Sequence, residues 1–159
     1  YSMAKIIQEK TIKFFASRLG YQYLILRIPG VYGKDSENQS IVSKLVAALN
    51  KNYSFKLTTS GNELRDYIYV DDIGKIIFKL SKLRLKNLTI NLSTGKSFKI
   101  FEIIKFIENN FKKKIYFHKK RFTKKNEYNL IYNNSLLKRY IPNYNFQLLD
   151  SFDYKGEFR

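Results

Sequence analysis

Apolar positions recur along this chain with two different spacings, and each spacing predicts one kind of secondary structure. Apolar residues three and four positions apart predict amphipathic helices, whereas short apolar runs rich in β-branched and aromatic residues predict buried strands. On this basis we expect helices over residues 1–19, 41–50, 73–83, 98–111 and 135–140. We expect strands over residues 21–28, 54–59, 67–70, 88–92 and 115–117, with a last helical turn within residues 147–152.

Polar residues and a proline mark the ends of several of these elements. Ser40, Ser97 and either Asp71 or Asp72 stand where helices are expected to begin, and their side chains are of the types that cap helix N-termini. Pro142 ends the helix that precedes it, because proline cannot continue a helical hydrogen-bond ladder. The order of helices and strands therefore predicts an α/β domain.

Two of the predicted strands, residues 23–28 and 88–92, are apolar enough to be central strands of a sheet. Strands of this kind are typical of a parallel sheet that is covered on both faces. We expect them to be central strands of a sheet whose first half is not in this chain. The chain begins at Tyr1 and has its only methionine at position 3, which also favours a fragment of a longer protein.

Composition and charge narrow the classes of function. The 159 residues contain no cysteine and one histidine, which argues against a disulfide framework and against a metal site. No apolar run approaches the roughly 18 residues of a membrane span, and no signal-peptide pattern is present, so we expect a cytoplasmic protein without a membrane partner.

The net charge of +17 invites a polyanionic partner such as nucleic acid. The excess comes from 23 lysines against 7 arginines, however, and the chain is rich in residues with AT-rich codons, which favours codon bias as its cause. A basic nucleic-acid-binding module remains the alternative. Its footprint would be residues 112–114 and 119–121, interleaved with Tyr116, Phe117 and Phe122.

The first candidate for chemistry is the pair Tyr1 and Lys5. Residues i and i+4 of a helix share one face, so the Tyr1 hydroxyl and the Lys5 ammonium can point into the same site. A neighbouring ammonium stabilises a phenolate and lowers the pKa of a tyrosine from about 10, which makes that tyrosine a usable acid or base. The same spacing also occurs in surface contacts, so the pair alone leaves both interpretations open.

Three later segments complete a pattern. Residues 26–33 read Leu-Arg-Ile-Pro-Gly-Val-Tyr-Gly, residues 65–72 read Arg-Asp-Tyr-Ile-Tyr-Val-Asp-Asp, and residues 91–95 read Asn-Leu-Ser-Thr-Gly. The first and third end expected strands, where ligands of open α/β sheets bind. Arg65 precedes an expected strand and could present its guanidinium to a diphosphate, although an ion pair with Asp66 or Asp72 is the simpler explanation.

Taken together and in this order, the four segments resemble the NAD-dependent epimerase/dehydratase family of the extended short-chain dehydrogenase/reductase superfamily, whose members act on nucleotide sugars. The resemblance runs from residue 1 to about residue 152. It implies the C-terminal portion of a Rossmann-like parallel sheet plus a small α/β substrate-binding subdomain. Residues 1–33 and 71–95 would complete the dinucleotide-binding sheet, and residues 34–70 and 96–159 would form the substrate-binding subdomain.

The resemblance implies roles for six residues and three kinds of partner. Tyr1 would be the acid/base, and Lys5 would tune Tyr1 and bind the nicotinamide ribose. Pro29 would lie beside the nicotinamide, and Gly30, Arg65 and Arg121 would contact the substrate. The implied cofactor is NAD, with NADP open, the implied substrate is a nucleotide sugar, and the intact enzyme is expected to be a homodimer that does not bind nucleic acid.

Two departures from the family pattern change what we expect of substrate contacts and of NAD binding by this chain. Gly30 stands where an asparagine is usual, which removes an amide expected to touch the nucleotide sugar. The glycine-rich phosphate loop is missing from the chain, so this chain alone should bind NAD poorly and be inactive. Epimerisation, dehydration and reduction remain equally open.

Overall fold

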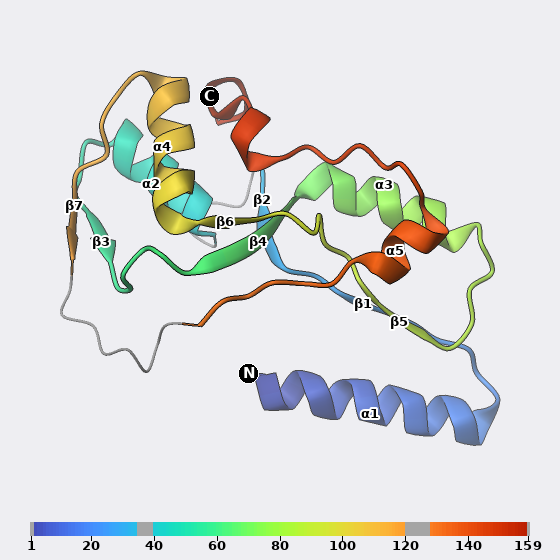
Figure 1. Cartoon of the computed structure of the whole chain (residues 1–159). Coiled ribbons are helices and arrows are strands. Elements are labelled where there is room, and N and C mark those ends of the chain that lie inside the picture. Colours follow the sequence, from blue (N-terminus) through green and yellow to red (C-terminus); the bar gives the residue numbers. More distant parts are fainter. Residues whose placement is uncertain (1, 35–39, 120–127, 159) are drawn as a thin grey trace.

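A computed structural model describes residues 2–34, 40–119 and 128–158 of the chain. The described residues form an α/β structure in which helices flank short strands, as the sequence predicts (Figure 1). The helices are α1 (Ser2–Leu19), α2 (Ile41–Asn50), α3 (Val70–Ser81), α4 (Ile100–Phe111), α5 (Ser135–Tyr140) and α6 (Tyr154–Glu157), with a 3-10 turn η2 (Leu149–Ser151). The strands are β1 (Leu24–Arg27), β2 (Gly30–Tyr32), β3 (Phe55–Leu57), β4 (Leu64–Tyr69), β5 (Leu88–Asn91), β6 (Ser97–Lys99) and β7 (Phe117–Lys119).

The two strands expected to be central, β1 and β5, pair in parallel, with Leu24 opposite Leu88 and Arg27 opposite Asn91. Their apolar side chains pack with one face of α3 and with α5, whose Leu137 is buried in the same cluster. In Figure 1, α3 and α5 lie on one side of this pair and α1 lies on the other. The predicted parallel pairing of these two strands is thereby confirmed.

Strand β4 is the centre of a second, mixed sheet. It pairs in parallel with β2 through residues 67–69 and antiparallel with β6 through residues 64–66. The prediction that Arg65 precedes this strand was wrong, because β4 begins at Leu64 and includes Arg65. Alternation along β4 buries Asp66 and Ile68, while Arg65, Tyr67 and Tyr69 are half-buried on the opposite face.

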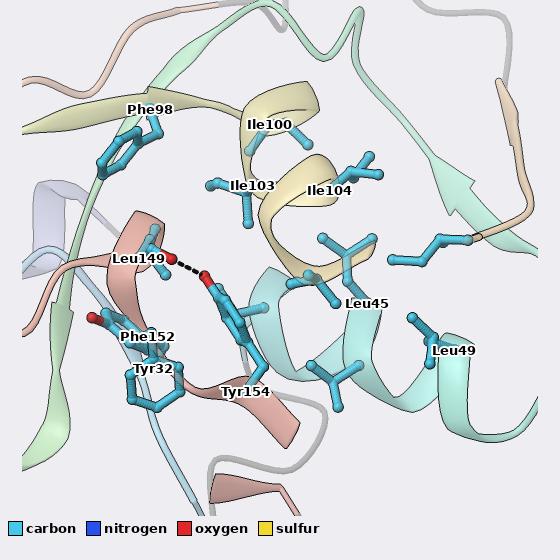
Figure 2. Packing of buried hydrophobic residues seen from close by; sticks show 14 of the residues in the cluster. Tyr32, Leu45, Leu49, Phe98, Ile100, Ile103, Ile104, Leu149, Phe152 and Tyr154 are labelled. Carbon is cyan, nitrogen blue, oxygen red and sulfur yellow. Dashed lines mark hydrogen bonds between the residues drawn. The ribbon is translucent and has the colours of Figure 1, made fainter. Parts of the chain in front are cut away.

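The larger apolar core lies between α2 and α4 and is closed by the C-terminal residues (Figure 2). Isoleucines of α4 face leucines of α2 at helical spacing, as their periodicity predicts. The buried ring of Tyr154 packs edge-on against Phe152, and its hydroxyl donates a hydrogen bond of 2.6 Å to the Leu149 carbonyl (Figure 2). That bond satisfies a backbone acceptor inside the core, where it would otherwise be costly.

Two of the predicted helix caps were wrong and one is confirmed. Ser40 caps α2, because its side chain accepts a hydrogen bond of 3.1 Å from the Ser43 amide. Ser97 instead belongs to β6, and α4 begins three residues later. Asp71 and Asp72 lie in the first turn of α3 and do not cap it, which leaves the Asp72 carboxylate for other partners.

Helix α1 is attached to the rest of the fold by few contacts. Only Ala16 is buried, and Glu9 forms a bidentate ion pair with Arg27 of β1, with both hydrogen bonds 2.7 Å long. The large apolar side chains of α1 are exposed: Met3, Ile6, Ile7, Ile12, Phe14, Phe15 and Leu19. No described residue covers this apolar surface, and no helix in the described part of the chain is long and apolar enough to span a membrane.

Candidate functional site

The first pair of candidate residues is only partly placed. Tyr1 lies outside the described residues, while Lys5 lies on the exposed surface of α1, one turn from the start of that helix. In Figure 1, helix α1 lies on the side of the β1–β5 pair opposite α3. The roles of Tyr1 and Lys5 therefore stay predictions.

Pro29 and Gly30 lie where the chain leaves β1 and enters β2. Pro29 is buried, and Gly30 is opposite Tyr67 in the β2–β4 register. A Cβ atom at position 30 would come within 2.4 Å of the Tyr67 ring, so the ring fills the space that a side chain would need. The absence of a side chain at position 30 is thus matched by an aromatic neighbour that the sequence reasoning did not single out.

Arg65 is held in one orientation by its neighbours on β4 and by the segment around Tyr128. Its Nη1 donates to the carbonyls of Leu64, at 3.2 Å, and of Tyr128. The guanidinium also lies over the Tyr128 ring, 5.2 Å from the ring centre, and Nη2 is 3.9 Å from the Glu63 carboxylate. The predicted ion pair with Asp66 or Asp72 was wrong, because Glu63 is the acidic neighbour.

The backbone around Arg65 is fixed as well. Residues 128–130 run parallel to the start of β4: the Leu130 amide donates to the Leu64 carbonyl at 2.9 Å, and the Asp66 amide donates to the Leu130 carbonyl at 3.1 Å. The Leu64 amide donates to the Asn129 side chain at 2.9 Å. Among the described residues, the hydrogen bonds that the Arg65 side chain donates come from Nη1, while Nη2 faces the Glu63 carboxylate.

Asp66, next to Arg65 but on the buried face, joins β4 to the turn after β5. Its carboxylate accepts a hydrogen bond of 2.9 Å from the Thr94 hydroxyl, and its other oxygen has no partner among the described residues. Burial raises the pKa of this carboxyl, an effect that the hydrogen bonds from the 93–95 turn partly offset. The turn also receives a bond of 3.1 Å from the Asn134 side chain to the Ser93 carbonyl. The Asp66 side chain therefore links β4 to the turn that follows β5.

Asp72 has a similar structural role at the start of α3. Its two oxygens accept bonds of 2.8 Å each from the Tyr144 hydroxyl and the Gln147 amide. The Gln147 carbonyl in turn accepts a bond of 2.6 Å from the Tyr32 hydroxyl. Tyr32 and Asp72 both belong to the recognised segments, and together they hold the C-terminal segment against β2 and α3.

The predicted polyanion footprint is only partly described, since residues 120–127, which include Arg121 and Phe122, lie outside the described residues. The aromatic residues of its described part are exposed: Tyr116 is 74% exposed and Phe117 is 39% exposed. In the described part of the chain, no cluster of three histidine, cysteine or acidic side chains could hold a metal ion.

Among the candidate residues, the structure brings Gly30 and Arg65 to neighbouring strands of one sheet, with Pro29 directly before β2. Sequence reasoning missed Glu63, Tyr67 and Tyr128, which surround Arg65. The i+2 spacing of Arg65 and Tyr67 could have indicated a shared face once Arg65 was placed inside the strand. Nothing in the local sequence indicates that Tyr128, 63 residues away, would contact Arg65.

Comparison with known proteins finds relatives whose names are those of nucleotide-sugar enzymes. Over 111 residues, 68% of this chain, the sequence is 32% identical to a provisionally assigned UDP-glucose 4-epimerase of Methanocaldococcus jannaschii, of which the match covers 36%. A GDP-6-deoxy-D-talose 4-dehydrogenase of Aggregatibacter actinomycetemcomitans is 29% identical over 67% of this chain and 36% of its own length. The chain thus spans little more than a third of the curated relatives it matches.

Solved structures show the same fold. UDP-glucuronic acid 4-epimerase of Bacillus cereus, in complex with UDP-glucuronic acid and NAD, superimposes with a TM-score of 0.85 at 16% identity. The match covers 94% of this chain and 48% of that one. UDP-glucose 4-epimerase of Thermotoga maritima, in complex with UDP-glucose, gives a TM-score of 0.75 at 24% identity, covering 87% of this chain and 46% of that one.

The sequence of this chain also matches a family directly. Residues 1–92 match the NAD dependent epimerase/dehydratase family. This stretch contains all but the end of the recognised pattern, including the segments that carry Lys5, Gly30 and Arg65. The chain therefore belongs to the NAD-dependent epimerase/dehydratase family.

Proposed function

We propose that the protein to which this chain belongs is an NAD-dependent epimerase or dehydratase of nucleotide sugars, and that this chain supplies the substrate diphosphate site and the acid/base pair. The observation that carries the proposal is Arg65, whose side chain is 16% exposed and is oriented by two backbone carbonyls. An arginine held in this way presents a planar fork to a phosphate without losing further side-chain entropy. The relatives that act on nucleotide sugars support the same substrate class.

In this proposal the chain's own residues move the proton. Tyr1 takes the proton of the sugar hydroxyl as that carbon becomes a carbonyl, and returns it in the reverse step. Lys5 favours the phenolate of Tyr1 by its positive charge. Bound NAD would supply the hydride chemistry at the same sugar carbon. The exposed Lys5 and the buried Pro29 at the end of β1 fit the nicotinamide end of NAD, and a glycine-rich loop for its diphosphate is not in the chain.

We propose that the chain contributes to two units with different binding roles. We propose that residues 1–33 and 71–95 complete the dinucleotide-binding sheet and that residues 34–70 and 96–159 form the substrate-binding subdomain. The packing of β1, β5 and α3 in one apolar cluster and of α2 and α4 in the other supports this division for those elements, whereas α5 packs in the cluster of β1 and β5. We further propose that the intact enzyme is a homodimer, because the exposed apolar residues of α1 offer a surface for a second copy.

Calorimetry with the 159-residue chain and UDP-glucose tests the proposal. The wild-type chain should bind UDP-glucose, and Arg65→Ala should weaken that binding by about tenfold or more, because a charge-assisted contact to phosphate is lost. Arg139→Ala is the matched control, since Arg139 is exposed on α5 and the net charge changes equally. Equal losses in the two variants would show non-specific attraction and refute the proposal.

The same chain should bind NAD poorly when no other polypeptide is present, because the helix N-terminus that receives the cofactor diphosphate is not in the sequence. Calorimetric titration with NAD checks this expectation. A micromolar dissociation constant would contradict it.

A second function is favoured by one observation, the exposure of Tyr116 and Phe117 beside the lysines at 112–114. Exposed aromatic rings among lysines can stack on the bases of a single-stranded nucleic acid. A mobility shift with single-stranded DNA that weakens in Tyr116→Ala, but not in Arg65→Ala, would support it. A mobility shift that is unchanged in Tyr116→Ala would show that the DNA is bound through net charge and not through stacking on Tyr116.

A further inference from the structure

One side of α3 carries a row of lysines beside an exposed aromatic ring. This row, the basic stripe, consists of residues three or four positions apart: Lys75, Phe78, Lys79 and Lys82. Because such spacings place residues on one side of a helix, the three ammonium groups share a surface. Phe78 is 61% exposed, and the Lys82 ammonium lies 4.0 Å from the centre of its ring, which keeps these two side chains together.

The basic stripe lines a groove between α3 and the C-terminal end of α5. A cavity of about 560 Å³ is lined by the stripe, by Leu83 and by residues 140–142. A second cavity of about 360 Å³, which Lys138 of α5 lines, shares Ile141 and Pro142 with the first. The two cavities therefore adjoin, and together we call them the α3–α5 groove.

The positive charge of the groove is not neutralised within the described residues. None of the acidic side chains that the structure describes lines either cavity. Lys75 is one turn after Asp71, a spacing that favours ion pairs, yet the lysines of the stripe form no ion pair with a described residue. The helix dipole accounts for lysines at the end of α3 but not for Lys75 in its middle.

The shape of the groove selects among anionic partners. Ile141 lines both cavities and is buried, so the bottom of the groove is apolar. A bilayer surface is flat and would leave this bottom unfilled. A nucleic acid would stack its bases on exposed rings, but the Lys82 ammonium occupies one face of Phe78. An amphipathic helix fits both features, because its apolar side chains enter a groove while its charged side chains stay at the rim.

The groove is separate from the other surfaces to which we assign binding. In Figure 1, α3 and α5 lie on the side of the β1–β5 pair opposite α1, whose apolar residues are proposed to meet a second copy. Neither α1 nor β4, which carries Arg65, contributes a lining residue to the groove. A partner bound here thus differs from the substrate and from a second copy of the chain.

We propose that the α3–α5 groove is the docking site for an acidic amphipathic helix of another protein. Apolar side chains of that helix pack against Phe78, Tyr140 and Pro142, and its carboxylates pair with the lysines of the basic stripe. The stripe spans about 10 Å at a rise of about 1.5 Å per residue, so about two turns of the partner helix meet it. This docking does not depend on the reaction that the intact enzyme performs.

Selection from a displayed library of random peptides tests the proposal. Peptides of about 16 residues, or about four helical turns, are selected on the 159-residue chain with an excess of the Lys75→Gln/Lys79→Gln/Lys82→Gln variant as competitor. The enriched peptides should be acidic, with apolar residues at helical spacing. By fluorescence anisotropy they should bind the wild-type chain at least about tenfold more tightly than the triple variant, and salt should weaken the binding.

Two variants and a charge reversal separate this site from general attraction. Lys44→Gln/Lys51→Gln/Lys105→Gln is the matched control, because these exposed lysines lie outside the groove and the net charge changes equally. Phe78→Ala keeps every lysine and should weaken the peptides about tenfold through the lost apolar contact. Changing the three lysines of the stripe to glutamate should create binding to a peptide whose glutamates are replaced by lysines. Thermal melts show whether each variant is folded.

The outcomes divide as follows between support and rejection. If no peptide is enriched over the triple variant, if the enriched peptides are not acidic, or if the control variant weakens them equally, the proposal is wrong. It is also wrong if only single-stranded DNA, or vesicles of phosphatidylcholine and phosphatidylglycerol in equal parts, lose binding in the triple variant and not in the control. Binding of UDP-glucose should be unchanged throughout, so a failure here leaves the proposed function standing.

Discussion

The interaction network around Asp72 should be one of the main supports of the C-terminal segment. Asp72 is 3% exposed, and its carboxylate accepts two hydrogen bonds of 2.8 Å, from the Tyr144 hydroxyl and the Gln147 amide. Replacing Asp72 with alanine removes both acceptors and leaves a backbone amide and a phenol without partners in a half-buried place.

The cost follows from the number and type of these bonds. Each hydrogen bond to a charged acceptor contributes about 1.5–3 kcal/mol, and relief from burying a carboxylate offsets part of the sum. We expect Asp72→Ala to lower the free energy of unfolding by about 3 kcal/mol, which corresponds to a loss of about 6–12 °C in melting temperature for a chain of this size. Asp72→Asn should cost less, because the Tyr144 hydroxyl can rotate to accept from the new amide.

Urea denaturation of the variants measures these differences. Asp71→Ala is the control, since Asp71 is exposed in the same first turn of α3 and should cost no more than about 1 kcal/mol through the helix dipole. If Asp72→Ala and Asp71→Ala lose the same free energy, the two hydrogen bonds do not stabilise the fold as argued and the account of the C-terminal segment is wrong.

Three further predictions concern stability. Because burial raises the pKa of Asp66 in the folded chain, the folded state holds this proton to higher pH than the unfolded chain does, so the free energy of unfolding should fall as pH rises above about 4. In Asp66→Asn that contribution to the slope should disappear, which denaturation at several pH values measures. Gly95→Ala should cost about 1–3 kcal/mol, because Gly95 has a φ of +72° and a Cβ would come within 2.6 Å of Asn134, whereas Gly74→Ala, with open space around it, should be neutral or stabilising in thermal melts. Tyr154→Phe should cost about 1–3 kcal/mol by leaving a buried carbonyl without its donor, and a loss below about 0.5 kcal/mol in urea denaturation would contradict that assignment.

Local patterns predicted the elements that depend on local physics. The periodicity of α2 and the exact limits of α5 follow from apolar spacing, a capping serine and a proline stop, all of which act within one or two turns. The start of β4 and the position of Ser97 in β6 could not be predicted from local patterns. Both depend on an antiparallel pairing between residues 64–66 and 97–99. Cross-strand hydrogen bonds overrode the capping preference of serine at that position.

In the candidate site too, some features follow from the local sequence and others depend on contacts between distant segments. The motif residues Arg65 and Gly30 could be named from the sequence, but the residues that hold or complement them could not. Tyr128 reaches Arg65 only because residues 128–130 pair with β4, a contact between segments more than 60 positions apart. Asp72 and Tyr32 could be recognised as part of a pattern, and only the structure shows that they bind the C-terminal segment.

The attachment of α1 decides how far the acid/base assignment can be carried. Arg65 is fixed by strand pairing and by carbonyl contacts, so the residue of the proposed diphosphate site is held within the described residues. Lys5 is on a helix that the Glu9–Arg27 ion pair and one buried alanine attach to the sheet, and an exposed ion pair of this kind contributes about 1 kcal/mol or less. The position of Lys5 relative to Arg65 must therefore be set by whatever covers the apolar face of α1. The two halves of the proposed site therefore differ: the residue proposed to bind substrate is held by the described fold, whereas the position of the residue proposed to assist proton transfer depends on what lies against α1.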